Sequence, residues 1–186
     1  MRTAEATRAE GAMRTRLLQA LRALDDRRCA LLDEVEALGP ERVVARPLPG
    51  KWCVLEIVEH LVLAERDVLQ QLPEPSQLVH RPRRLRDRVS YPIVIFVLKH
   101  GIPVPVPSPR MVPTGGASLA ELRREWDRNQ TWIRAYVDGL DREGFGRAVF
   151  AHPVAGPLTA AQAIHLGRVH VETHARQIGR LIALRS

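Results

Sequence analysis

Apolar side chains recur at steps of three and four residues in four separate segments of this 186-residue chain. That spacing places them along one face of an α-helix. The segments run from Met13 to Leu38, from about Cys53 to Leu72, from Ser118 to about Leu140, and onward from Thr159. The strict alternation that predicts a β-strand is nearly absent. The sequence therefore predicts an all-α fold.

Local signals mark the ends of these helices. Gly39-Pro40 ends the first segment and Pro73 ends the second, because proline cannot continue a helix. Ser118 and Glu121, three residues apart, form the pattern of a capping box. Thr159 can cap the last helix. These signals fix the register of the third and fourth helices.

Residues 73–117 separate the second helix from the third and hold nine of the chain's 14 prolines. We expect a long Pro-rich crossover, extended in places, with one short helix around Asp87 to His100. It is either a lid over a pocket or an insertion that covers apolar core. Four helices joined by one long crossover describe a four-helix bundle. Residues 1–186 are long enough for one such domain.

Three histidines fall on the helix faces that carry the apolar residues. His170 and His174 project from the same face one turn apart, and the stripe of the last helix turns that face inward. The stripe of the second helix points His60 inward as well. Buried imidazoles need partners, and three of them can hold one divalent ion with coordination positions left open. The alternative is a histidine pair on a solvated face.

Nearby glutamates carry weaker signals. Glu56 lies one turn before His60 on the same face, which makes it a candidate partner of a ligand or a general base. An ordinary exposed carboxylate is the alternative. Glu59 and Glu172 turn away from the ligand face and are expected in solvent. The other four histidines are expected outside the site: His80, His100, His152 and His165. His152 should hydrogen-bond or pack within its loop.

A formal net charge of +7 raises the question of nucleic acid. The basic residues cluster only between Arg81 and Arg88, and no aromatic side chain is interleaved there to stack on bases. Nucleic acid is therefore a disfavoured partner, and the cluster is either a solvated loop or a lip for an anionic small molecule. No apolar run reaches the ~20 residues of a membrane span, so no membrane partner is expected.

The compartment is predicted from the cysteines and the N-terminus. Two cysteines give no disulfide framework and suit a reducing environment. The first residues contain no apolar segment of the kind that a secretory signal needs. A cytoplasmic location is expected.

Two motifs of the chain resemble the DinB-like superfamily. The first is Pro49-Gly50-Lys51-Trp52 followed by Glu56-Ile57-Val58-Glu59-His60-Leu61, and the second joins residues 152–159 to His170-x-x-x-His174-x-x-Gln177-Ile178. The resemblance covers most of the chain and is weak in residues 73–117. It departs at Cys53, where the family usually has serine or threonine, and cysteine caps a helix poorly.

The resemblance implies a four-helix bundle with a divalent metal, zinc or nickel, held by His60, His170 and His174. It also implies a metal-dependent thiol S-transferase that acts on small electrophiles in detoxification, with a low-molecular-weight thiol as partner and a homodimer as the assembly. Two alternatives stay open. One is a metal-dependent hydrolase that uses activated water, and the other is a non-catalytic metal- or ligand-binding stress protein.

Overall fold

The computed structural model describes residues 2–184, with residues 2–7 and 9 as backbone only. In that range the chain forms helices, three short 3₁₀ turns and one two-stranded antiparallel sheet. The elements are α1 (Arg2–Glu36), α2 (Pro40–Val43), α3 (Val54–Leu69), η1 (Pro75–Gln77), α4 (Leu85–Lys99), η2 (Pro109–Met111), α5 (Leu119–Asp138), η3 (Gly144–Gly146), β1 (Ala148–His152), β2 (Gly156–Thr159) and α6 (Ala160–Ala183). The mostly helical class predicted from the sequence is confirmed, and the small sheet is an addition to it.

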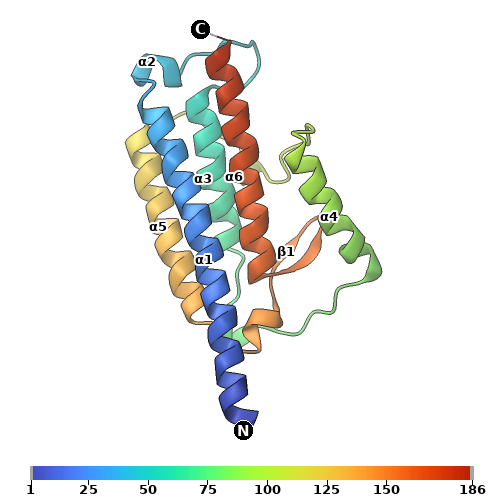
Figure 1. The fold of residues 1–186 in the computed structure, drawn as a ribbon. Helices are drawn as coiled ribbons and strands as arrows, with labels where there is room; N and C mark the ends of the chain where they lie inside the picture. The colour runs from blue at the N-terminus through green and yellow to red at the C-terminus, as the bar shows by residue number, and fades with distance from the viewer. Residues whose placement is uncertain (1, 185–186) are drawn as a thin grey trace.

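Four long helices, α1, α3, α5 and α6, lie side by side and enclose the hydrophobic core (Figure 1). Each of them turns an apolar stripe inward, as the spacing of apolar residues requires. Fully buried side chains come from all four helices: Leu31 and Leu32 from α1, Ile57 and Leu61 from α3, Trp126 from α5, and Ile178 from α6. Among the helices of residues 2–184, none combines the length and the apolar character that crossing a membrane requires.

The start signals of α5 and α6 act as predicted. The Ser118 hydroxyl accepts from the Glu121 N–H, while the Glu121 carboxylate accepts from the Ser118 N–H at 2.8 Å. Thr159 and Gln162 form the same reciprocal pair at the start of α6. α1, in contrast, begins well before the predicted Met13, and α2 was not expected. The capped starts set the rotation of the two helices and hence the faces that they turn inward.

A hairpin of β1 and β2 leads into α6 and lies beside α4 (Figure 1). Gly156, which opens β2, has a φ of 71°, and a Cβ at this position would lie 2.6 Å from the Cγ of Asp87 on α4. Glycine is required both by the left-handed backbone and by this close approach. The expectation that His152 lies in a loop was wrong. β1 buries Val149 and Phe150 in succession at an irregularity of the strand register, so it lacks the alternation that predicts a strand.

The crossover between α3 and α5 contains η1, α4 and η2. α4 occupies the place of the short helix predicted around Asp87 to His100. It stands apart from the four long helices and contacts α6 and β2 (Figure 1). The chain then returns through η2 to contact α3. This return brings the end of the crossover to the helix that carries His60.

Candidate metal centre

Three imidazoles from two helices meet at one point. α3 contributes His60, and α6 contributes His170 and His174. The Nε2 atom of His170 lies 3.3 Å from Nε2 of His60 and 3.1 Å from Nε2 of His174. His60 is buried, and the other two are half-buried. The three histidines singled out from the sequence are therefore positioned to bind one metal ion.

A second hydrogen bond fixes which nitrogen carries the proton in two of these rings. Nδ1 of His60 lies 2.8 Å from the carbonyl oxygen of Met111, and Nδ1 of His174 lies 2.8 Å from Oε1 of Gln177. An amide oxygen can only accept a hydrogen bond, so each Nδ1 donates. In the neutral rings, Nε2 of His60 and of His174 then presents a bare lone pair to the centre of the cluster.

This arrangement contains a contact that a cation would relieve. His170 has a single Nε2, which can donate a hydrogen bond to His60 or to His174 but not to both. At least one of the two short nitrogen–nitrogen contacts therefore lacks a hydrogen bond, and the lone pair of one ring faces a nitrogen that offers it no proton. A divalent ion among the three nitrogens would turn all three lone pairs into ligands. The donor set of this chain therefore fits a metal.

Burial keeps the three imidazoles in the neutral form that metal binding requires. It lowers the pKa of His60. Burial and the neighbouring imidazoles lower the pKa of His174 to about 4 and the pKa of His170 well below its usual value. The hydrogen bonds to Met111 and Gln177 oppose these shifts without outweighing them. Protons therefore compete poorly with a metal ion for these nitrogens near neutral pH.

Two groups far from α6 in the sequence lie against His60. The carbonyl oxygen of Met111 comes from η2, at the end of the crossover. The indole ring of Trp52 lies on the N-terminal side of α3, with its centroid 5.0 Å from that of the His60 ring. Of these two, only Trp52 was singled out from the sequence, as part of the first motif. Met111 acts through its backbone, so its side chain gave no signal.

Glu59 anchors the end of the crossover to α3. Its carboxylate accepts hydrogen bonds from the N–H and the hydroxyl of Thr114 and from the N–H of Gly115, at 2.8 to 3.0 Å. The side chain is buried, so the expectation that Glu59 lies in solvent was wrong. Glu172 is exposed, as expected. The anchor holds the segment that presents the Met111 carbonyl to His60.

Glu56 lies at the start of α3 rather than beside the imidazoles. Its carboxylate accepts from the Cys53 N–H at 2.9 Å and from the Arg46 guanidinium at 2.5 Å. Burial alone would raise the pKa of Glu56, but these hydrogen bonds outweigh it and lower the pKa. Within the described residues, its hydrogen bonds go to these two partners. The observed role of Glu56 is therefore to complete the cap that Cys53 makes poorly on its own.

The other four histidines lie outside the cluster, as expected. Nδ1 of His165 contacts the Tyr91 hydroxyl at 2.9 Å. Nδ1 of His152, at the end of β1, accepts from the N–H groups of Val154 and Ala155 in the turn that follows. The remaining two, His80 and His100, are exposed. No role was predicted for Gln177, although its position three residues after His174 is the spacing at which helix side chains meet.

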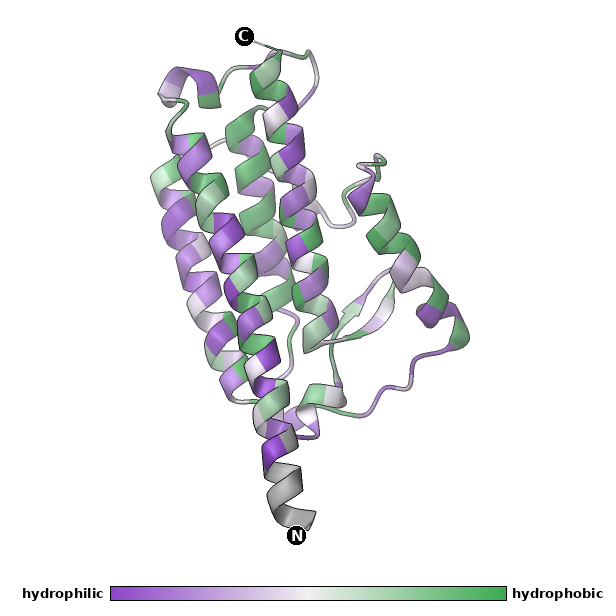
Figure 2. Cartoon of the chain, in the orientation of Figure 1, coloured by the Kyte–Doolittle hydropathy of each residue, from purple (hydrophilic) through white to green (hydrophobic). Residues whose placement is uncertain are grey.

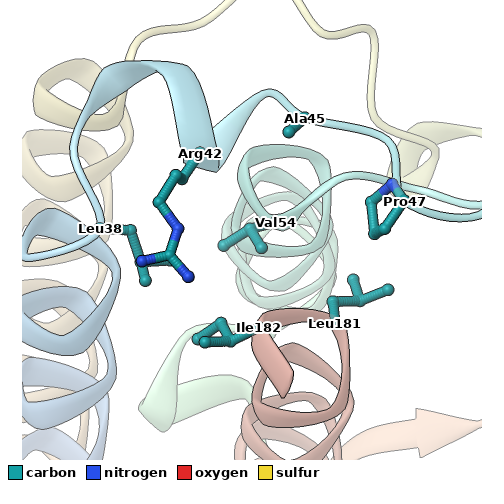
Figure 3. A pocket seen from close by; sticks show the side chains of 7 residues that line it. All are labelled: Leu38, Arg42, Ala45, Pro47, Val54, Leu181 and Ile182. Atoms are coloured by element: carbon teal, nitrogen blue, oxygen red, sulfur yellow. The ribbon is translucent and has the colours of Figure 1, made fainter. Parts of the chain in front are cut away.

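A small cavity lies at the end of the molecule next to α2 (Figure 3). It is lined by Leu38, Arg42, Ala45, Pro47, Val54, Leu181 and Ile182. Its volume of about 10 Å³ holds no more than one water molecule. None of the three clustered histidines lines it, so it is not a substrate site for them.

A family model described as the DinB superfamily matches residues 23–178. The matched range includes α3 and the part of α6 that carries the histidines. Searches of curated proteins and of solved structures give no significant match. The family model agrees with the resemblance that the two sequence motifs carry.

Proposed function

Because the chain belongs to the DinB superfamily, we propose that it is a metal-dependent thiol S-transferase that acts on small electrophiles. The observation that carries the proposal is the inward-facing set of Nε2 atoms on His60, His170 and His174, two of which are held by hydrogen bonds from Nδ1. Zinc and nickel are the proposed ions, since imidazole nitrogen suits both. The four aligned helices would then be the four-helix bundle of the family.

The side chains of the protein would bind and orient the reactants. Three histidine ligands leave coordination positions open for a thiol. The Met111 carbonyl and the Gln177 amide would hold two of the rings in their ligating orientation. The Trp52 ring would form an apolar wall beside His60 and keep water from the attacking sulfur.

A divalent ion at this site would lower the pKa of a bound thiol, so that the thiolate is present near neutral pH. In the transfer, the sulfur forms a bond to the electrophilic carbon, the leaving group departs with its electron pair, and the thiol proton passes to solvent. Glu56 is engaged with Arg46 and Cys53. We therefore assign no proton transfer to Glu56.

The test is a thiol-transfer assay on tag-free protein loaded with zinc or nickel. A panel of low-molecular-weight thiols, including glutathione and free cysteine, would be combined with monochlorobimane, and the conjugate would be followed by fluorescence. We expect at least one thiol to react faster with the loaded protein present. The His170→Ala, His174→Ala double variant should lose this acceleration. His165→Ala, which changes a histidine of the same helix outside the cluster, should keep it.

Two results would contradict the proposal. Hydrolysis of an ester by the loaded protein with no thiol present, together with no thiol transfer, would indicate a hydrolase. Tight metal binding without turnover in either assay would indicate a non-catalytic metal protein.

A further inference from the structure

α4 is apolar on two opposite faces, and only one of them is covered. The covered face contacts α6 and β2, with Ile95 buried and the Tyr91 hydroxyl bonded to His165. The opposite face carries four large apolar side chains, with exposed fractions that range from 53% to 79%: Leu85, Val89, Ile93 and Phe96. Figure 2 shows apolar residues along most of the length of α4. An uncovered apolar face of this kind indicates a contact surface.

The exposed residues form one continuous stripe. Their spacing of four, four and three residues keeps them on one side of the helix. At 1.5 Å per residue, the stripe from Leu85 to Phe96 is about 17 Å long. Ile102 and Val104, just after the helix, are also exposed. This is an extended apolar surface rather than a single exposed side chain.

Cations flank this stripe on both sides. Arg86 borders it on one side, and Arg88 and Lys99 border it on the other, as helical rotation of 100° per residue requires. All three are exposed. Five arginines lie between Arg81 and Arg88. The single acid of α4, Asp87, is buried and accepts from the Arg84 N–H. The unpartnered face is therefore apolar at its centre and positive at its rim.

We propose that this face of α4 binds the surface of an anionic lipid bilayer. Apolar side chains would enter the boundary between headgroups and acyl chains, and the arginines would contact the lipid phosphates. A second copy of the chain is disfavoured on this face, because a symmetric α4 pair would bring six of these flanking cations together, and the one acid of α4, Asp87, is buried beside Arg86. α4 also stands apart from the four long helices (Figure 1). Binding in the plane of a bilayer needs no membrane-spanning helix.

The test is co-sedimentation of the full chain with vesicles at about 0.15 M salt. One set of vesicles contains equal parts of phosphatidylglycerol and phosphatidylcholine, and the other contains phosphatidylcholine alone. We expect binding to the first set and little to the second. The paired substitution Ile93→Ser, Phe96→Ser should weaken binding at least about 10-fold with the charge unchanged. Arg86→Gln and Arg88→Gln should each weaken it about 5-fold.

Two matched controls separate this face from a general effect of the positive charge. Val44→Ser removes an apolar side chain as exposed as Ile93, at the end of α2. Arg22→Gln removes an exposed arginine of α1. Both variants should bind like the parent. Circular dichroism would confirm that every variant is folded, which is expected because each changed side chain is exposed.

Three results would overturn the proposal. The first is absence of binding to the anionic vesicles. The second is binding that Ile93→Ser, Phe96→Ser leaves unchanged, because charge alone would then account for it. The third is a dimer, detected by light scattering, that this paired substitution converts to a monomer. That third result would assign the face to a second copy of the chain.

Discussion

Gln177 offers the sharpest test of how the site is held. Its Oε1 lies 2.8 Å from Nδ1 of His174 and accepts a hydrogen bond from that nitrogen. Gln177→Leu would remove the acceptor and keep a side chain of similar size. His174 could then carry its proton on Nε2, which is the nitrogen that faces His60 and His170. Metal binding would then have to displace this proton from Nε2, which would weaken the affinity for the metal.

The expected magnitude follows from the loss of one hydrogen bond. A hydrogen bond of this kind contributes about 1 kcal/mol, and loss of the partner of a ligating histidine weakens metal affinity by about 10- to 100-fold. We therefore expect Gln177→Leu to bind zinc about 10-fold more weakly than the parent. Gln177→Glu should bind at least as tightly as the parent, because a carboxylate is a stronger acceptor.

The assay is competition for zinc with a chromogenic chelator at one fixed pH. Gln19→Leu, which changes an exposed glutamine on α1, is the matched control and should bind like the parent. Equal zinc affinity of Gln177→Leu and the parent, with both folded, would refute the claim that the Gln177 amide holds His174 for ligation.

Three further predictions concern stability. The pKa of Glu65 is raised from 4.5 to about 7 because its carboxylate is buried, although Gln130 donates to it at 2.8 Å. Below pH 4.5 the carboxyl is protonated in both the folded and the unfolded chain. As the pH rises from about 4.5 to about 7, the unfolded chain loses this proton more readily, so the free energy of unfolding of the parent should fall by on the order of 3 kcal/mol relative to Glu65→Gln. Urea denaturation at several pH values would measure this difference. A flat difference between the two across this range would contradict the assignment. Glu59→Ala should lower the free energy of unfolding by about 3 kcal/mol, because it deletes the three hydrogen bonds that anchor the crossover. It should also speed proteolysis between α4 and α5, and an unchanged rate of proteolysis would count against the anchor. Gly156→Ala should cost about 3 kcal/mol in a thermal melt, because its Cβ would lie 2.6 Å from Asp87 in a left-handed backbone, whereas Gly146→Ala, with open space around it, should be nearly neutral.

Local information accounts for the parts of the fold that the sequence predicted. The caps at Ser118 and Thr159 involve residues three positions apart, so the starts of α5 and α6 could be predicted without knowledge of their neighbours. Helical periodicity then placed His170 and His174 on one inward face. The position of His60 followed from the same rule on α3.

The missed features depend on contacts between distant segments. Glu59 is buried because its partners, Thr114 and Gly115, lie 55 and 56 residues further along the chain. The acceptor for His60 is a backbone carbonyl, that of Met111, which no side-chain pattern indicates. The exposed stripe of α4 could not be predicted from the sequence either, because only the structure shows which of the two apolar faces is covered.

The metal content of the purified protein shows whether His60, His170 and His174 form a metal site. Tag-free protein and the His170→Ala, His174→Ala double variant would each be incubated with zinc or nickel, freed of excess ion and examined by elemental analysis. We expect close to one ion per chain in the parent and almost none in the variant. A parent without metal, or a variant that retains the metal content of the parent, would show that these histidines do not form a metal site.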